Sequence, residues 1–290
     1  MKASLALALV ACSAPASVEH PRTADAPLSV AADERMITIP AGPFIAGSTP
    51  EERAQAYDDY QHTAGTDAAR ERHWFEREED RHQVTLPAYR IDLMPVTQSQ
   101  FAEFVDAKGA PAPTIDDAAW KAQGFAQDFA TEVARFIWRD GRPPSGREDH
   151  PVVLVTWTDA DAYCRWRGQI VGHPRRLPTA HEFEKAARGD NGVIYPWGNT
   201  FEPARLNCAI DGPRDTEPVG GHLDGTSPYG VLGTAGNVFQ WTSTPFPPDE
   251  MTVKGSAWED FAGVGRGASA HGRAKTARHV IVGFRCASDP

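Results

Sequence analysis

The pattern of apolar and polar positions in the middle of the chain predicts a buried strand followed by a helix. Residues 152–155 are all apolar and predict a strand that is buried on both faces. Thr158 stands three residues before Asp161, which is the spacing of a helix N-cap. Apolar residues then recur at helical spacing, at Ala162, Tyr163 and Trp166. The pattern therefore predicts a helix that buries one face.

A second helix follows, and the sequence marks both of its ends. Thr179 and Glu182 have the spacing of a capping box, in which two side chains accept backbone N–H groups of the first helical turn. Gly189 is the predicted stop signal. Between them lie apolar residues at helical spacing, at Phe183, Ala186 and Ala187. The aromatic turn at residues 195–199 then reverses the chain.

The first third of the chain carries signals of the same kinds. His82–Leu86 and residues 89–93 have the composition of strands. Thr49 is followed by a proline and two glutamates, which marks the start of a helix. Thr97 is the predicted N-cap of a further helix, which Gly109 ends. Strands and helices are thus interspersed, with long irregular stretches between them.

Composition narrows the possible partners. The chain has 290 residues, enough for one large or two small domains, and 41% of them are hydrophobic, which supports a sizeable core. The 29 basic and 39 acidic side chains give a formal net charge of −10. A net negative charge argues against nucleic acids and anionic membrane surfaces as partners. Eight tryptophans and 24 prolines favour an irregular, turn-rich fold over a helical bundle.

The first residues resemble a bacterial lipoprotein signal. Lys2 precedes a short apolar run at residues 3–10, and Leu9-Val10-Ala11-Cys12 resembles a lipobox, whose cysteine is acylated. We predict a signal peptide at 1–12, lipidation of Cys12, a flexible tether at 13–33, and export to the outer membrane or periplasm. The alternatives are an ordinary secretory signal that is cleaved nearby, or a start codon placed too early.

A set of longer motifs resembles one known family. The chain contains VTWTDADAYCRW, RLPTAHEFEKAARG, YPWGN, TEPVGG, SPYGVLGTAGNVFQWT and GFRCA, in this order. They resemble the motifs of the sulfatase-modifying-factor, or formylglycine-generating-enzyme, domain, and they span residues 36–288. The resemblance implies an α+β, C-type-lectin-like fold with many loops, here over residues 34–290. Stretches near 49–80 and 110–149 would then be insertions, the second forming part of a cleft rim.

The resemblance also implies a disulfide. In some family members the cysteines equivalent to Cys164 and Cys286 are paired, so we predict this bridge. The alternative is a pair of buried free thiols. Cys208 has no family partner and is expected to be buried.

The catalytic cysteines of the family are missing. Family enzymes bind copper through two cysteines after a Gly-Gly-Ser triplet, because Cu(I) prefers soft sulfur ligands. The equivalent positions here fall at Asp260 and Gly265, and no cysteine stands between Cys208 and Cys286. The resemblance therefore predicts that copper and its oxidation chemistry are absent.

The resemblance also implies calcium as a cofactor, with a metal-free loop as the alternative. The family positions fall at Asn207, the Cys208 carbonyl, Asp211 and the Pro213 carbonyl, all oxygen donors of the kind that Ca²⁺ takes. The alternative is a loop with Asx turns and no metal. A second family calcium site would use Gly233 and Gln240, and the loss of carboxylate-type ligands predicts that this site is lost.

The family's active cleft defines a last group of residues. By position it contains Trp258, Asp260, Arg266, His271 and Arg273. An iron site with two histidines and one carboxylate could be composed from Asp260, His271 and His279, but solvated surface histidines are the favoured interpretation.

Three functional hypotheses follow. The first is an envelope protein of this family without copper chemistry, which acts as a binding or accessory module for a peptide, protein or glycan. The second is a divergent oxidoreductase of the formylglycine-generating type that uses another metal. The third is a structural component of the cell envelope.

Overall fold

The computed structural model describes residues 35–290. The predicted signal peptide at 1–12, the lipidation site Cys12 and the tether at 13–33 lie outside the described residues. Within the part that is described, no helix is both long and apolar enough to span a lipid bilayer.

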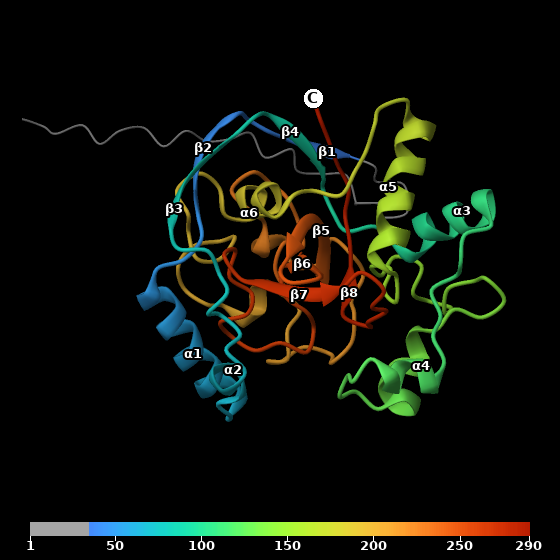
Figure 1. The fold of residues 1–290 in the computed structure, drawn as a ribbon, viewed down its shortest axis with the longest axis horizontal. Helices are drawn as coiled ribbons and strands as arrows, with labels where there is room; N and C mark the ends of the chain where they lie inside the picture. Colours follow the sequence, from blue (N-terminus) through green and yellow to red (C-terminus); the bar gives the residue numbers. More distant parts are fainter. Residues whose placement is uncertain (1–34) are drawn as a thin grey trace, which may run out of the picture.

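Short sheets and separate helices alternate along the chain in an α+β arrangement (Figure 1). A three-stranded sheet has the order β1 (Met36–Ile39), β4 (Tyr89–Asp92), β9 (Ala287–Ser288). A two-stranded sheet pairs β2 (Gly42–Ala46) with β3 (His82–Leu86). The four-stranded sheet has the order β7 (Ala270–Ala274), β6 (Glu250–Lys254), β5 (Phe239–Phe246), β8 (Val282–Gly283), with β5 and β8 parallel. Because β4 pairs with both β1 and β9, the first and last described strands share one sheet.

The helices begin at threonine caps wherever they are longer than two turns. They are α1 (Pro50–Ala64), α2 (Ala68–Glu71), α3 (Gln98–Lys108), α4 (Asp117–Ala122), α5 (Trp157–Val171) and α6 (Ala180–Arg188). Short π- and 3₁₀-helical turns lie at Phe129–Val133, Ala134–Phe136, Pro203–Arg205 and Leu223–Gly225. The predicted caps Thr49, Thr97 and Thr179 are confirmed, each with a complete capping box.

The predicted cap of α5 is wrong by two residues. Thr156, not Thr158, accepts the backbone N–H of Asp159, and the Asp159 carboxylate accepts the N–H of Thr156 in return. Both threonines have an aspartate three residues later, so spacing alone did not separate them. Asp161 instead forms an ion pair with Arg165 on the outer face of the helix.

The predicted strand at residues 152–155 is also wrong, although all four side chains are buried. Leu154 has a φ of 59°, which is outside the extended region and interrupts a strand. The backbone N–H groups of Val152 and Leu154 accordingly donate to two separate partners, the carbonyls of Val96 and His279. This apolar segment therefore crosses the core as an irregular connection.

The predicted disulfide is confirmed and lies beside the aromatic core. Cys164 on α5 is bonded to Cys286 near the C-terminus, with Cα atoms 5.6 Å apart. The Tyr163 ring packs against Phe284 at 5.3 Å and against Phe101 at 5.7 Å. Cys208 is free and buried, as predicted. The bridge thus attaches the longest helix of the second half to the last strand through a fully buried contact.

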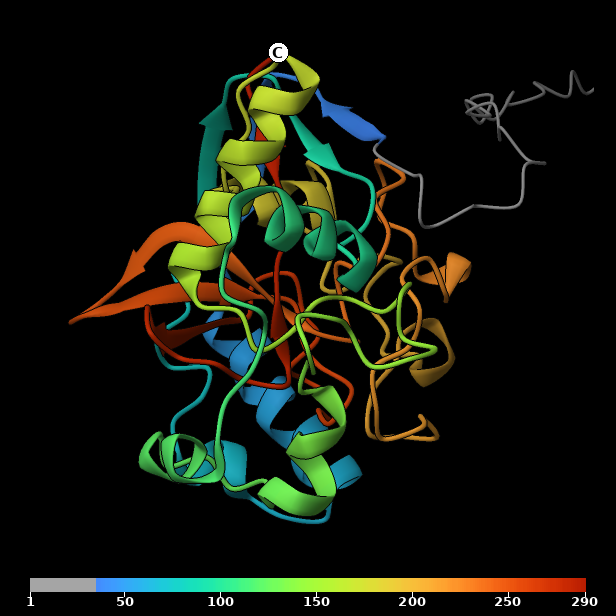
Figure 2. The same cartoon turned by 90° about the vertical axis from the view of Figure 1, so that its right-hand side faces the viewer.

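Two segments far apart in sequence lie at the same end of the molecule. In both views α1, α2 and α4 lie below the four-stranded sheet (Figures 1 and 2). They belong to the stretches near 49–80 and 110–149 that we predicted to be insertions. The residues that follow α2 and α4 approach the sheet from two sides and enclose the largest hollow described below.

Candidate functional site

A cavity of about 640 Å³ is formed where these segments meet the four-stranded sheet. Its walls come from the chain after α2, the chain after α4, strands β5 to β7, the loop between β6 and β7, and the segment between β7 and β8. The lining includes aromatic, basic and acidic side chains, among them Arg72, Trp74, Arg77, Phe125, Gln127, Phe246, Glu250, Glu259, Asp260, His271, Arg273 and His279. Residues 124–127, which belong to the second predicted insertion, form part of the cavity wall.

Three of the five predicted cleft residues line this cavity, and two do not. Asp260, His271 and Arg273 face it. Trp258 is buried and stacks against Phe136, with ring centroids 6.3 Å apart. Arg266 is also buried, where its guanidinium binds Glu78 at 2.5 and 3.1 Å. Trp258 and Arg266 therefore make structural contacts away from the cavity.

Two adjacent carboxylates give the cavity its acidic side. Burial, followed by the charge of Glu259, raises the pKa of Asp260 to about 7. Burial also raises the pKa of Glu259, whose carboxylate accepts two hydrogen bonds from Gln127 at 2.8 and 2.9 Å. The Asp260 carboxylate accepts the backbone N–H of Ala257 at 2.7 Å. A carboxyl group in this position can exchange its proton near neutral pH.

His271 and His279 are not solvated surface residues, so that interpretation was wrong. Burial, with the charge of Arg273 as the next cause, lowers the pKa of His271 to about 3, and its ring packs against Phe239 at 5.3 Å. Burial likewise lowers the pKa of His279, whose ring lies 4.0 Å from that of Phe125. Both rings are therefore neutral near pH 7 and serve as aromatic walls.

The iron set composed from Asp260, His271 and His279 does not assemble. Within residues 35–290 one group of three His, Cys, Asp or Glu side chains brings its ligand atoms within 4.8 Å of one another, and it contains none of these three. Asp260 belongs to the loop between β6 and β7, His271 to β7, and His279 to the segment after β7.

Neither of the family's copper positions carries a sulfur atom, although Cys208 lies near Asp260, whose backbone carbonyl accepts the N–H of Ala209 at 2.8 Å. Asp260 faces the cavity, whereas Gly265 is closely packed: a Cβ there would approach Ser256 Oγ at 3.1 Å and a Leu206 methyl at 3.2 Å. Of the cysteines in the described chain, none lines the cavity. The Cys208 thiol lies 3.5 Å from the Ile210 carbonyl, and burial raises its pKa, so it is a poor source of thiolate.

The predicted calcium loop contains an unsatisfied oxygen. Asn207 Oδ1 is buried without a hydrogen-bond partner, while its Nδ2 donates to the Asp215 carbonyl at 2.8 Å. The Cys208 carbonyl lies on the same side, because a Cβ on Gly212 would meet both this carbonyl and Asn207 Oδ1. Asp211 and Pro213 follow in the exposed part of the loop. A buried oxygen without a donor, next to a carbonyl, fits a hard cation such as Ca²⁺.

The positions of the second family calcium site are filled by an internal cation. Arg285 is fully buried and donates to Gln240 Oε1 at 2.6 Å and to the Gly233 carbonyl at 2.7 Å. Gln240 Nε2 donates to the same carbonyl at 2.8 Å. The oxygen atoms that a metal would need are thus already hydrogen-bonded.

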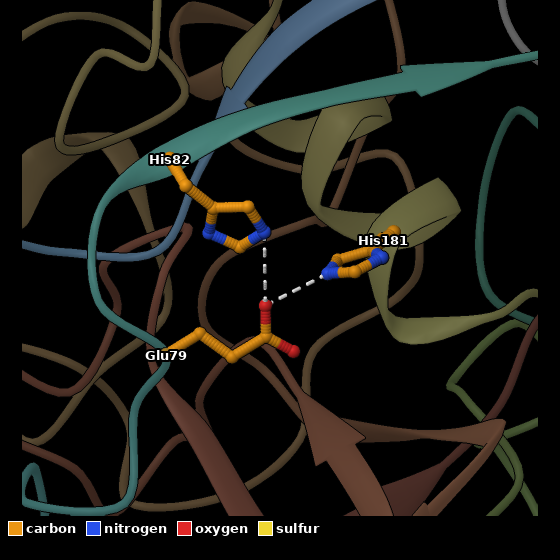
Figure 3. Close-up of side chains that lie close together, drawn as sticks. All are labelled: Glu79, His82 and His181. Carbon is orange, nitrogen blue, oxygen red and sulfur yellow. Dashed lines mark hydrogen bonds and ion pairs between the residues drawn. The ribbon is translucent and has the colours of Figure 1, made fainter.

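Sequence reasoning missed a convergence of Glu79, His82 and His181, which lie between the β2–β3 sheet and α6 (Figure 3). His181 lies on α6, 102 residues after Glu79. Glu79 and His82 form a Glu-x-x-His pair at the start of β3, which was the one local signal. The partner on the helix could not be found from the sequence, because only the fold brings α6 against this sheet.

Comparison with known proteins identifies relatives over most of the chain. Residues 23–290 match the family described as "Sulfatase-modifying factor enzyme 1-like domain". The chain is 32% identical to "Inactive C-alpha-formylglycine-generating enzyme 2" of Mus musculus, over 90% of this chain and 88% of that protein. It is 31% identical to "Formylglycine-generating enzyme" of Streptomyces coelicolor, over 82% of this chain and 77% of that protein.

The solved structure of PvdO from Pseudomonas aeruginosa has the same fold. It superimposes with a TM-score of 0.64 at 20% identity, over 88% of this chain and 94% of PvdO. The motifs, the α+β arrangement and these alignments agree, and the chain belongs to the sulfatase-modifying-factor, or formylglycine-generating-enzyme-like, domain family.

Proposed function

We propose that this protein is a family member without copper-dependent cysteine oxidation, and that it works as a binding or accessory module. The observation that carries the proposal is the cavity itself, whose described walls contain no sulfur, with Asp260 and Gly265 at the family's cysteine positions. Copper chemistry of this type requires soft thiolate ligands. A hard carboxylate and a glycine cannot replace them.

The relatives are compatible with this proposal and also with an active enzyme. One relative is named an inactive enzyme and another an active one, at nearly the same identity to this chain. Overall similarity therefore does not discriminate between the two classes, and the residues of the cavity must do so. The divergent oxidoreductase, with another metal in this cavity, is the second hypothesis. Among residues 35–290 no assembled ligand set in the cavity supports it.

The chemistry of the cavity favours a peptide as its ligand, over a protein surface or a glycan. Its volume lies in the usual range for ligand sites, roughly 300–1,000 Å³. Glu250, Glu259 and Asp260 can accept donors from a basic side chain, and Arg72 and Arg273 can donate to backbone carbonyls or carboxylates. Trp74 and Phe246 add apolar surface. Mixed charge around aromatic walls suits a short segment that carries both polar and apolar side chains.

The test uses a peptide with the Cys-x-Pro-x-Arg pattern that family enzymes oxidise. Incubated with the protein, Cu⁺, a thiol reductant and oxygen, this peptide is expected to keep its full mass, because no thiolate pair is available. Mass spectrometry detects conversion to the aldehyde as a loss of sulfur.

A separate titration measures binding of the same peptide, carrying a fluorescent label. The peptide is expected to bind roughly tenfold more weakly to Glu259→Gln than to the wild type, because the variant loses one charge-assisted hydrogen bond.

The Streptomyces coelicolor relative, treated in the same way, is the positive control for turnover. Aldehyde formation by our protein, or copper or iron in stoichiometric amount after purification, would contradict the non-catalytic role. If peptides bind with an affinity that Glu259→Gln does not change, the binding site lies elsewhere and the cavity proposal is lost.

Calcium is proposed at the loop that contains Asn207, with the Cys208 carbonyl, Asp211 and the Pro213 carbonyl as the other ligands. Bound calcium would coordinate the unsatisfied Asn207 oxygen and fix the loop. Protein treated with EGTA is expected to gain about 2.7 kcal/mol of stability when Ca²⁺ is added at one hundred times its dissociation constant. Thermal unfolding with and without CaCl₂ measures this gain as a rise in Tm.

The Ca²⁺-dependent rise in Tm should be lost in Asn207→Ala and reduced in Asp211→Asn. Asn191→Ala removes an exposed asparagine and serves as the matched control, since its rise in Tm should equal that of the wild type. Comparing the rise, rather than Tm itself, separates calcium binding from any direct cost of the substitution. A wild type that does not respond to Ca²⁺ would disprove the site.

Export and lipidation at Cys12 stay predictions from the sequence, as does the location in the outer membrane or periplasm. If they hold, a lipid anchor would be the protein's only membrane contact, and a role as a structural envelope component would remain compatible with a non-catalytic cavity.

A further inference from the structure

The group formed by Glu79, His82 and His181 lies outside the cavity described above and is separate from the family's copper and calcium positions. His181 Nε2 is 2.9 Å from Glu79 Oε2, and His82 Nε2 is 3.7 Å from the same oxygen (Figure 3). All three ligand atoms lie within 4.8 Å of one another. The side chains are 57%, 47% and 32% exposed in the order Glu79, His82, His181, so an ion can reach them from solvent.

The second nitrogen of His82 is already oriented for metal binding. His82 Nδ1 lies 2.8 Å from the Asp80 carbonyl, which can only accept a hydrogen bond. This contact places the ring proton on Nδ1 and leaves the Nε2 lone pair directed at Glu79. Histidines that bind metals commonly use one nitrogen as ligand and donate the other N–H to a carbonyl or carboxylate.

The backbone that carries the three side chains is held in place. Ser48 N donates to the Glu79 carbonyl at 3.0 Å, and a Cβ on Gly47 would meet that carbonyl at 2.5 Å, so the Glu79 segment lies directly against β2. Gly47 N in turn donates to Glu184 on α6 at 2.8 Å. Glu184 lies one helical turn after His181. The contacts that join the end of β2 to α6 therefore also set the distance of His181 from Glu79 and His82.

We propose that Glu79, His82 and His181 form a site for a divalent transition-metal ion of the Zn²⁺ type. Two imidazoles and one carboxylate are an established protein ligand set for Zn²⁺, and three protein ligands leave one tetrahedral position open. Glu79 and His181 also line a second hollow of about 360 Å³, beside Arg77 and Lys254. A further ligand of the ion would therefore have room in this hollow, next to two basic side chains.

The distances require little movement. Ligand atoms about 2.0–2.2 Å from a tetrahedral ion lie roughly 3.3–3.6 Å from one another. The two measured nitrogen–oxygen distances, 2.9 and 3.7 Å, lie on either side of this range. Small rotations of exposed side chains are enough to bring both to the required value.

A plain hydrogen bond between histidine and glutamate is the competing explanation, and the chain offers an internal comparison. His222 Nε2 lies 2.8 Å from Glu217 Oε2, nearly the same contact as that of His181 with Glu79. The other ring nitrogen of His222, Nδ1, lies 3.0 Å from the Ala204 carbonyl. Among the described residues, no second histidine joins this pair. A pair of this kind binds no ion tightly, so the second histidine is the feature that distinguishes the proposed site.

The experiment titrates ZnCl₂ into the full chain, freed of metal by EDTA, without a polyhistidine tag and with excess CaCl₂ present. Isothermal titration calorimetry should report one Zn²⁺ per chain at micromolar concentrations. His82→Asn and His181→Asn should each weaken binding by at least roughly tenfold, since even loss of a residue behind the ligands costs 10- to 100-fold. His222→Asn, at a position with a φ of 45° that asparagine tolerates, should bind as the wild type does.

X-ray absorption of the Zn²⁺-loaded wild type gives a second measurement that needs no variant. It should show nitrogen and oxygen neighbours with imidazole scattering and no sulfur, which excludes Cys208 as the ligand. No stoichiometric binding, a sulfur neighbour, or wild-type affinity in both histidine variants would overturn the site. None of these outcomes depends on whether the cavity binds peptide, so the two proposals are tested separately.

Discussion

Replacing Cys164 and Cys286 with alanine is expected to lower the free energy of unfolding by roughly 4 to 5 kcal/mol, the entropy that a bridge of this length removes from the unfolded chain. The two cysteines are 122 residues apart, so the bridge restricts a large part of the unfolded ensemble. Both sulfur atoms lie in the core, where alanine introduces no polar group. Urea denaturation of the wild type and the double variant measures the difference.

Cys208→Ala is the matched control, because it removes a buried thiol that closes no loop. It reports the cost of losing one sulfur atom from the core, which is subtracted twice from the loss in the double variant. If nothing remains after this subtraction, the bridge does not stabilise the protein. Reduced wild-type protein should unfold at nearly the same urea concentration as the double variant.

The local elements were the part of this fold that the sequence predicted well. Thr49, Thr97 and Thr179 were located as helix caps because a capping box requires only residues three positions apart. The same rule failed at α5, where Thr156 and Thr158 compete within one turn and the register is decided by packing. The irregular path of residues 152–155 was missed because burial of all four side chains does not reveal the left-handed φ of Leu154.

The long-range features depended on the family resemblance or were not found. The Cys164–Cys286 pairing came from the resemblance, since four cysteines alone do not define their partners. The resemblance assigned all five residues to one cleft, but it could not show that Arg266 and Trp258 turn away into the core. His181 joins Glu79 and His82 only through the packing of α6 on the β2–β3 sheet, which no local pattern encodes.

That packing depends on a buried group of charges. Removing the negative charge from this group is the second change for which we expect a large loss of stability. Glu184 on α6 is 4% exposed and binds Lys254 at 2.9 Å and Arg188 at 3.0 Å, both of which are buried. Glu184→Gln keeps the shape and the acceptor for Gly47 but leaves two buried cations without a counter-charge. Such a loss costs about 3–5 kcal/mol, which urea denaturation at pH 7 should show.

The pH dependence of this effect has a definite sign. Burial alone would raise the pKa of Glu184, but the charges of Lys254 and Arg188 outweigh it, and the pKa is lowered. A carboxylate with a lowered pKa stabilises the folded state above its unfolded pKa, about 4.5, and this contribution is lost as the pH falls through the folded value. The difference in stability between wild type and Glu184→Gln should therefore shrink on acidification below that range.

Asp161→Asn gives the matched comparison on a neighbouring helix. Asp161 and Arg165 have the same i,i+4 spacing as Glu184 and Arg188, but Arg165 is 69% exposed, so water replaces the lost partner. Its removal should cost no more than about 0.5 kcal/mol. If Glu184→Gln cost as little, the buried cations would have to be solvated or neutral, and the contacts that hold α6 against β2 would not be electrostatic. The geometry of the proposed metal ligands would then need another explanation.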